Sequence, residues 1–395
     1  MPHLRKRHGL TLLQKLLAFW PVTAIIGPRQ CGKSTLAEAI MPSGAGKYTF
    51  DDYELREEAQ GSIKSFVSRL KSPAIIDEVQ KVPIIFDELK RIVDKKRISG
   101  SYLLTGSSSF SDQGSIRESL TGRIGVLRLH PFTWAERNEQ SQAKVNFCQP
   151  WKTKSVRASV ESVSKDLVLG GMPVPAFTRS DEQRELYWSS WLETSIYRDM
   201  ARLFKRNYDP EIAFSILRQI GKTLVEGELP TLRHFKERAV IVKRYLSAME
   251  MLFIVQRHRC HPSGIGKDVW LFMDTGLARF VMKTENGAGV KLSLIRHFLW
   301  NEWLCHWDYQ GKRLDPIYYK SAQGNPVDLV CEDIPIRIIA NLEQVTRRLS
   351  WEERPLRGVM KKLGSEYGII VAPVQRTIPP DKNDGVAIVP WGAWS

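Results

Sequence analysis

Short apolar runs alternate with longer amphipathic stretches through the first third of the chain. Apolar runs bounded by polar turns are typical of strands buried in a parallel sheet, and the stretches between them have helical periodicity. Alternating strands and helices predict an α/β fold with helices packed on a sheet. The expected strands are 22–26, 48–50, 74–78, 101–108 and 125–129, and the expected helices are 35–40, 54–70 and 84–93.

A glycine-rich loop joins the first expected strand to the helix that follows. It fits G-x-x-x-x-G-K-[ST], and such a loop before a helix N-terminus aims backbone N–H groups at phosphate. Lys33 is expected to reach the β- and γ-phosphates of ATP, and the Ser34 hydroxyl is expected to bind Mg²⁺. A chance match, or a loop that binds without hydrolysis, is the alternative, which the strand–helix setting disfavours. The residues of this candidate nucleotide site are Gly27, Pro28, Arg29, Gln30, Cys31, Gly32, Lys33, Ser34 and Thr35.

Two carboxylates end the expected strand 74–78. Asp77 is expected to hold Mg²⁺ through Ser34 or a water molecule, and Glu78 is expected to polarise the attacking water. Ser107 lies at the polar end of the expected strand 101–108, and the carboxyl ends of parallel strands converge on the ligand. Thr105 or Ser107 could therefore touch the γ-phosphate or the attacking water, although a simple turn or helix cap has the same composition. The pattern predicts hydrolysis as well as binding.

Arg123 ends a polar segment that precedes the expected strand 125–129. An arginine beside a nucleotide can stabilise the charge of the transition state. We expect Arg123 to act in this way, either on its own nucleotide or on that of a neighbouring subunit.

The whole chain has 395 residues and a formal net charge of +15. The length suggests two or three domains, and the excess of Lys and Arg favours a polyanionic partner. Nucleic acid is the first candidate, an anionic membrane surface the second, and a diffusely basic surface the neutral alternative. The five cysteines show no paired metal spacing, which favours a reduced, cytoplasmic setting.

The N-terminus carries the basic stretch 4–7 followed by apolar residues, a composition that signal peptides share. Gln14 and Lys15 interrupt the apolar run, and the apolar residues fall on one helical face. We therefore expect an amphipathic helix that leads into the first strand. No apolar run is long enough to span a membrane, so no membrane partner is expected.

The second half contains a basic region. Residues 201–260 carry twelve Lys or Arg against six Asp or Glu. A helix expected to begin near Ala239 would project Lys243 and Arg244, with 252–255 as a possible strand behind it. Such a helix can enter a major groove or contact phosphates. A packing module with solvated charges is the alternative.

Several motifs in this order resemble those of prokaryotic AAA-type ATPases fused to a C-terminal domain of unknown function. The resemblance implies a winged helix in the second half and then a restriction-endonuclease-like α/β fold. It implies the division 1–140 for the ATPase domain, 141–165 for a linker, 166–285 for a helical, winged-helix-like region and 286–395 for the last domain. The matching stretches are 27–34, 77–78, 104–108, 119–123, 130–132, 169–173, 196–200 and 274–277.

The last domain departs from the pattern of a working nuclease. Asp328 is present, but Arg296, Pro326, Arg337 and Ile339 stand where the resemblance implies acidic residues or the catalytic lysine. A cation in place of a metal ligand repels the metal, so we expect an inactive site. The same charge could favour the DNA backbone, with Arg337 and Arg347 as candidate contacts.

The sequence therefore predicts a Mg²⁺-dependent AAA-type ATPase that acts on nucleic acid, with DNA as the first candidate, as a homo-oligomer. A nucleotide-driven switch that regulates a protein partner is the alternative. A nuclease with a rebuilt site is the third possibility.

Overall fold

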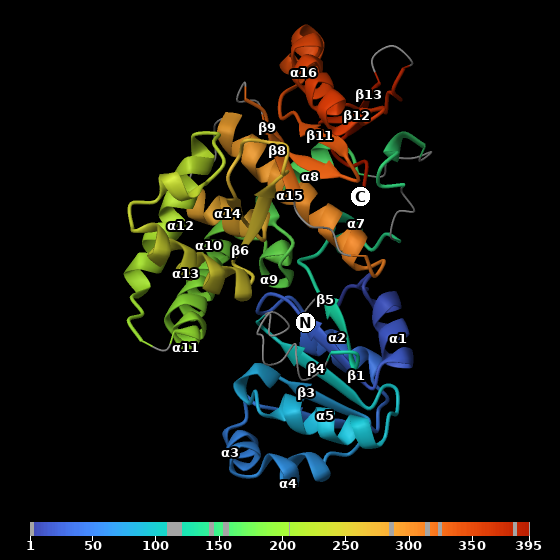
Figure 1. The fold of residues 1–395 in the computed structure, drawn as a ribbon, viewed down its shortest axis with the longest axis vertical. Coiled ribbons are helices and arrows are strands. Elements are labelled where there is room, and N and C mark those ends of the chain that lie inside the picture. Colours follow the sequence, from blue (N-terminus) through green and yellow to red (C-terminus); the bar gives the residue numbers. More distant parts are fainter. Residues whose placement is uncertain are drawn as a thin grey trace.

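The structure is a computed structural model. It describes residues 4–108, 121–141, 146–152, 158–204, 206–283, 288–312, 317–322, 326–381 and 385–394, without the side chains of 288, 326 and 342–352. The first sheet and its helices form one end of the molecule, and the helical region and the C-terminal strands form the other (Figure 1).

The first part is a five-stranded sheet whose neighbouring strands are all parallel. Its order is β2-β3-β4-β1-β5, so β1 lies between strands that come later in the chain. This confirms the predicted α/β fold with a parallel sheet. The strands are β1 (Val22–Ile26), β2 (Gly46–Thr49), β3 (Ala74–Asp77), β4 (Tyr102–Gly106) and β5 (Ile124–Arg128).

Helices cover both faces of this sheet. Ile25 belongs to the cluster that holds Leu13 and Leu36, whereas Ala24 belongs to the cluster that holds Leu89. Successive strand residues point to opposite faces, so both faces must be apolar. The helices are α1 (Leu10–Phe19), α2 (Lys33–Ile40), α3 (Tyr53–Gly61), α4 (Ile63–Ser68), η1 (Val79–Lys81) and α5 (Ile85–Lys95).

Two predictions for this part are refined. The lead-in helix is confirmed as α1. The single helix expected over 54–70 is two helices, because the Ser62 side chain accepts a hydrogen bond from the Ser65 N–H and so begins α4. Serine at such a position satisfies an N–H group that the new helix leaves unpaired.

The middle of the chain is mainly helical. The predicted linker 141–165 includes the start of α8, whose N-terminus Ser159 caps. The strand expected at 252–255 is wrong: residues 252–254 close α13, with the Ile254 N–H bonded to Met249 O, and the strand begins at Val255. The elements are α7 (Trp134–Arg137), η3 (Pro150–Lys152), α8 (Val160–Leu169), α9 (Pro173–Phe177), α10 (Asp181–Glu193), the π-helical η4 (Thr194–Met200), α11 (Ala201–Leu203), α12 (Pro210–Val225), η5 (Leu232–His234), α13 (Ala239–Met251), β6 (Val255–Cys260), β7 (Val269–Phe272) and α14 (Thr275–Met282).

The C-terminal part is a second α/β unit with two four-stranded sheets. One has the order β10-β11-β12-β13, and the other joins β8 and β9 to β6 and β7. Its strands β7 and β13 were not anticipated. The elements are α15 (Ala288–Asp308), β8 (Ile317–Lys320), β9 (Pro326–Val327), β10 (Leu329–Cys331), β11 (Ile334–Ile338), α16 (Leu342–Leu363), β12 (Gly368–Ala372) and β13 (Val386–Pro390).

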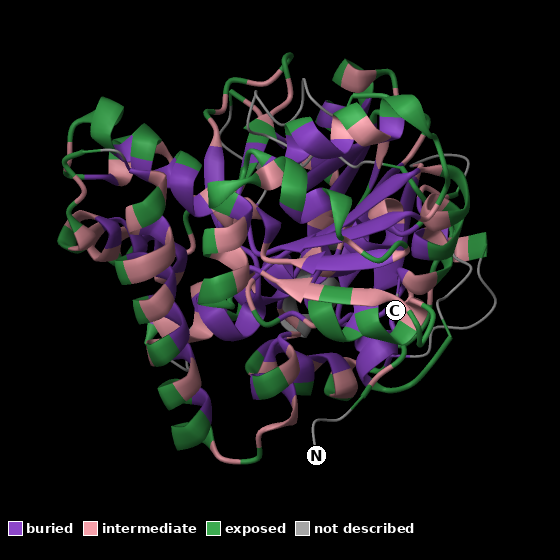
Figure 2. Cartoon of the chain, turned by 90° about the horizontal axis from the view of Figure 1, so that it is seen from below, coloured by how far each residue is buried: buried purple, intermediate pink, exposed green. Residues whose placement is uncertain are grey.

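One hydrophobic cluster runs through both halves. It contains Leu13 of α1, Trp134 of α7, Trp191 of α10 and Trp303 of α15, all of them buried. Figure 2 shows buried residues extending through the sheet and the helices beside it. Among the described helices, none is both long and apolar enough to cross a membrane.

Candidate nucleotide-binding site

The glycine-rich loop leaves the carboxyl end of β1 and enters α2. Gly32 has φ +97°, in the left-handed region that favours glycine. A Cβ on Gly27 would lie 2.2 Å from the Leu129 carbonyl oxygen, so only glycine fits there. Gln30 also has a positive φ, of +63°. The loop therefore turns tightly and presents the N-terminus of α2, the arrangement that binds phosphate.

Lys33 lies within the loop at the start of α2. Its ammonium donates to the carbonyl oxygens of Gly27 at 3.1 Å and Pro28 at 2.7 Å. The residue is 5% exposed, so its charge is held beside the loop backbone. A phosphate group in the loop would offer this ammonium a charged partner in place of two neutral carbonyls.

Asp77 joins the loop to the neighbouring strands. The Ser34 hydroxyl donates to Asp77 Oδ2 at 3.0 Å, and the Thr105 hydroxyl donates to Oδ1. Parallel register places Ile25 of β1 beside Thr105 of β4, and β3 pairs with β4 on its other side. Ser34 and Asp77 are thus in contact, and their role as Mg²⁺ ligands stays a prediction.

Glu78 directly follows β3 and has φ +55° and ψ +40°. Its Oε2 accepts hydrogen bonds from the Ser107 hydroxyl at 3.1 Å and from the Gln80 amide. Burial raises the pKa of this carboxyl, and the nearby Lys33 ammonium lowers it in part. Ser107 thus contacts Glu78, and Gln80 is a partner that the sequence did not reveal.

The oxygen atoms at this site suit Mg²⁺. The ion prefers hard oxygen ligands, keeps several waters and is usually shared with substrate phosphates. Ser34 and Asp77 supply a hydroxyl and a carboxylate in contact. The described part of the chain holds no group of three or more His, Cys, Asp or Glu arranged for a metal. A magnesium ion here would therefore take its other ligands from nucleotide and water.

The second half of the chain reaches the loop directly. Asp199 of η4 pairs with Arg29 at 3.4 Å and with Arg198 at 2.8 Å. Trp191 of α10 donates its indole N–H to the Arg29 carbonyl oxygen at 3.1 Å. From the other side, Arg7 donates to the Cys31 carbonyl oxygen at 3.1 Å. None of these contacts was predicted for the site.

Arg123 lies at the amino end of β5, whereas the loop follows the carboxyl end of β1. Ile124 of β5 is in register with Val22, whereas the loop follows Ile26 at the other end of β1. Five strand residues span about 16 Å at roughly 3.3 Å per residue. The guanidinium is bonded to both carboxylate oxygens of Asp94, at 2.5 and 3.0 Å. This geometry opposes a role for Arg123 at its own nucleotide.

The candidate nucleic-acid residues have different surroundings. Lys243 lines a cavity of about 840 Å³ formed with η5, β6 and β7. Arg244 instead donates to the Arg206 carbonyl oxygen at 3.0 Å and lies over the Phe204 ring at 4.3 Å. Arg337 is half-buried in β11, and the Arg347 side chain lies outside the described residues. The three described side chains thus have different surroundings, and contact of any of the four with nucleic acid stays a prediction.

Asp328 lies between β9 and β10 in a buried ion pair. Its Oδ1 accepts a hydrogen bond from Arg296 Nε at 2.5 Å, and its Oδ2 accepts one from the Ile338 N–H at 2.8 Å. Arg296 and Asp328 are 4% and 5% exposed. The carboxylate that a nuclease would need for metal is thus already neutralised by a cation. The absence of cleavage activity stays a prediction.

Replacement of Asp328 by alanine is expected to lower the free energy of unfolding by about 3 kcal/mol, because Arg296 would remain buried without its partner. Urea unfolding monitored by circular dichroism measures this. The matched double variant Asp328→Ala/Arg296→Met removes both charges and should recover much of the loss. Equal instability of the single and double variants would contradict the assigned role of the pair.

Comparison with known proteins agrees with the first sheet and its loop. Residues 20–138 match the family described as AAA domain. The uncharacterized protein Rv2008c of Mycobacterium tuberculosis is 28% identical over 342 residues, which cover 83% of this chain and 71% of that protein. The uncharacterized protein Mb2031c of Mycobacterium bovis gives the same values. The matched residues, with the sheet and loop described above, support an AAA-type P-loop ATPase domain in the first part of the chain.

Solved structures give weaker matches. The Walker-type ATPase PABY2304 of Pyrococcus abyssi is 14% identical with a TM-score of 0.40, over 69% of this chain and 94% of that chain. The Holliday junction branch migration motor RuvB of Thermotoga maritima is 16% identical with a TM-score of 0.31, over 70% and 93%. Neither score indicates a shared overall fold.

Proposed function

We propose that this protein is a Mg²⁺-dependent ATPase of the AAA type that acts on nucleic acid, with DNA as the first candidate. The observation that carries the proposal is the contact of Ser34 with Asp77 beside the half-buried Glu78. Ser34 begins α2, whereas Asp77 ends β3 and Glu78 follows it, and phosphoryl transfer requires these groups together. A homo-oligomer in the cytoplasm is part of the proposal.

Different residues of the site would perform the different steps of ATP hydrolysis. Lys33 and the loop N–H groups would hold the phosphates, and Ser34 and Asp77 would hold Mg²⁺, which neutralises charge on the phosphate oxygens. Glu78 would orient the attacking water and accept its proton. Its hydrogen bonds from Ser107 and Gln80 fix the carboxylate toward the end of the sheet where the loop lies.

Support for a nucleic-acid partner comes from the cavity beside α13, together with the net charge of +15. Four cations line this cavity: Arg233, Lys243, Arg257 and Lys267. Arg257 is paired with Asp268 and Arg233 with Glu228. Lys243 on the helix and Lys267 before β7 are both exposed and line the cavity from different elements. Exposed lysines of this kind can contact phosphates.

Charge reversal in this cavity tests the nucleic-acid proposal. Lys243→Glu/Lys267→Glu should weaken DNA binding by at least about tenfold. It should also reduce the slope of log affinity against log salt by about 2, because two phosphate contacts are lost. Fluorescence anisotropy with single-stranded, duplex and branched DNA, at several salt concentrations, measures both quantities. ATP turnover measured with the same DNAs shows which structure stimulates hydrolysis.

The control variant is Lys15→Glu/Lys64→Glu, which makes the same change of charge at exposed positions on α1 and α4. It should bind DNA nearly as the wild type does. Equal loss in the two variants would show that net charge, not the cavity, attracts DNA. If no DNA binds and none changes turnover, the regulatory switch acting on a protein partner becomes the better explanation.

A further inference from the structure

Two backbone carbonyl oxygens of the glycine-rich loop accept hydrogen bonds from side chains that lie far from the loop in the sequence. The Trp191 indole N–H donates to Arg29 O at 3.1 Å, and Arg7 Nη1 donates to Cys31 O at 3.1 Å. Trp191 and Arg7 are 4% and 6% exposed, so water does not compete freely for either bond.

The direction of these two carbonyl groups determines where the N–H groups of the same peptides point. In a planar trans peptide, the C=O and the N–H point in opposite directions. The hydrogen bond to Arg29 O fixes a peptide whose carbonyl points out of the loop, so the Gln30 N–H of the same peptide points into the loop. The hydrogen bond to Cys31 O orients the Gly32 N–H in the same way. Within the described part of the chain, neither N–H donates to a backbone oxygen. Successive N–H groups of this kind form an anion-binding nest.

We propose that Trp191 and Arg7 are positioning residues of the phosphate site. Each holds one loop peptide so that the next N–H faces the phosphates, and Trp191 does so from the second half of the chain. This inference rests on the proposed function, since it requires the loop to bind a nucleotide.

Trp191 can perform this role because α10 is held in place around it. Next to Trp191, Asp199 of η4 pairs with Arg29 at 3.4 Å and so ties the same segment to the loop a second time. Trp188 packs edge-on against Trp191, with ring centroids 5.7 Å apart. The indole therefore cannot turn away from the loop without movement of its neighbours.

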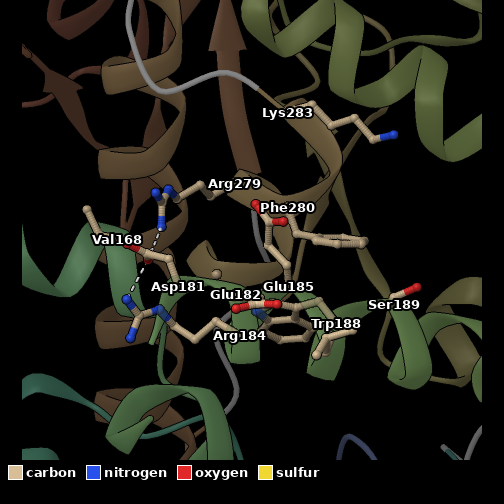
Figure 3. Close-up of a pocket in the computed structure, with 12 residues that line it drawn as sticks. Val168, Asp181, Glu182, Arg184, Glu185, Trp188, Ser189, Arg279, Phe280 and Lys283 are labelled. Carbon is tan, nitrogen blue, oxygen red and sulfur yellow. Dashed lines mark hydrogen bonds and ion pairs between the residues drawn. The ribbon is translucent and has the colours of Figure 1, made fainter. Parts of the chain in front are cut away.

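Helix α10 is also joined to α14 by an ion pair (Figure 3). Asp181 of α10 bonds to Arg279 of α14 at 3.5 Å and to Arg184 at 2.5 Å. These groups and Trp188 line a cavity of about 630 Å³ between the two helices. The position of the Trp191 N–H is thus set by the packing of the helical region, and nucleotide affinity should depend on that packing.

The test variant is Trp191→Phe, and Trp188→Phe is its matched control. Trp188 is as deeply buried and belongs to the same ring pair, but only the Trp191 indole donates to the loop in the described structure. Arg7 is unsuitable, because its removal would leave Glu136 buried without its ion-pair partner.

Trp191→Phe should weaken the binding of ATP and of ADP by about fivefold each, the effect of one neutral hydrogen bond. The KM for ATP should rise by a similar factor while kcat stays near the wild-type value, because the loop cradles phosphates that both nucleotides carry. Isothermal titration calorimetry and steady-state kinetics measure these quantities. Trp188→Phe should leave them within about twofold.

Unchanged affinity in Trp191→Phe, or equal loss in both variants, would overturn the inference, since packing alone would then explain the result. If the phenylalanine variant does not fold, Trp191→β-(3-benzothienyl)alanine keeps the ring shape without the N–H, and the same weakening is expected. A wild-type protein that binds neither nucleotide would instead overturn the proposed function.

Discussion

Glu78→Gln is expected to lower ATP turnover by about 100-fold or more and to leave ATP binding intact. Glutamine preserves the shape of the side chain but cannot accept a proton from the attacking water. The hydrogen-bond partners Ser107 and Gln80 remain, so the loop and Mg²⁺ ligands should keep their positions. Phosphate release measures turnover, and a fluorescent ATP analogue measures binding.

Lys33→Ala is the companion variant for this experiment. It removes the cation that faces the β- and γ-phosphates and should abolish binding itself. The two variants thus separate binding from hydrolysis within one site. Wild-type turnover in Glu78→Gln would show that another group activates the water, and the role proposed for Glu78 would be wrong.

Arg123→Ala is expected to reduce turnover by roughly 10³-fold if the side chain reaches the nucleotide of a neighbouring subunit. Nucleotide affinity and the fold should change little, because Arg123 is far from its own loop. Mixing Arg123→Ala with Lys33→Ala protein tests this directly. The first variant keeps an intact loop and the second keeps its Arg123, so shared interfaces would restore activity.

Asp94→Asn is the control for Arg123. It weakens the only carboxylate pairing of Arg123 that the described residues show, but it retains the guanidinium. If Asp94→Asn reproduces the loss seen in Arg123→Ala, the residue acts by anchoring β5 to α5. No recovered activity at any mixing ratio would likewise reject a contribution from a neighbouring subunit.

The sequence predicted the centre of the site well, because the signals there are local. The loop from Gly27 to Thr35 lies between a strand and a helix, and Asp77 ends the next strand but one. In a parallel sheet these ends meet at the same edge, so their proximity follows from order alone. The contact of Ser34 with Asp77 needed no knowledge of the second half.

The outer part of the site could not be predicted in the same way. Trp191 and Asp199 lie more than 160 residues from Arg29, and no local periodicity indicates which distant carbonyl or cation a side chain will meet. The sequence showed Arg7 only as part of the basic stretch 4–7, yet the residue is buried and paired with Glu136. A cation whose charge is satisfied inside the fold has the same sequence signal as one in water.

The C-terminal part shows a further limit of sequence patterns. The substitution of an expected acidic residue by Arg296 indicated a lost metal site, but its ion pair with Asp328 depends on how α15 crosses β9 and β10. Strand β6 was misplaced because most of its residues are polar, including the buried His258, while the apolar run before it closes a helix.

The hydrophobic cluster shared by α1, α7, α10 and α15 has a consequence for how such proteins can diversify. Domains that share no hydrophobic core and are joined only by a linker can be exchanged between genes without further substitutions to restore packing. Here a recombination that replaced the second half would remove Ser162 and Glu302, which bond to Trp134, and would also remove the Trp191 indole that bonds to the loop. Sequence changes that keep this protein folded should therefore be substitutions within each half. The two halves should be inherited together.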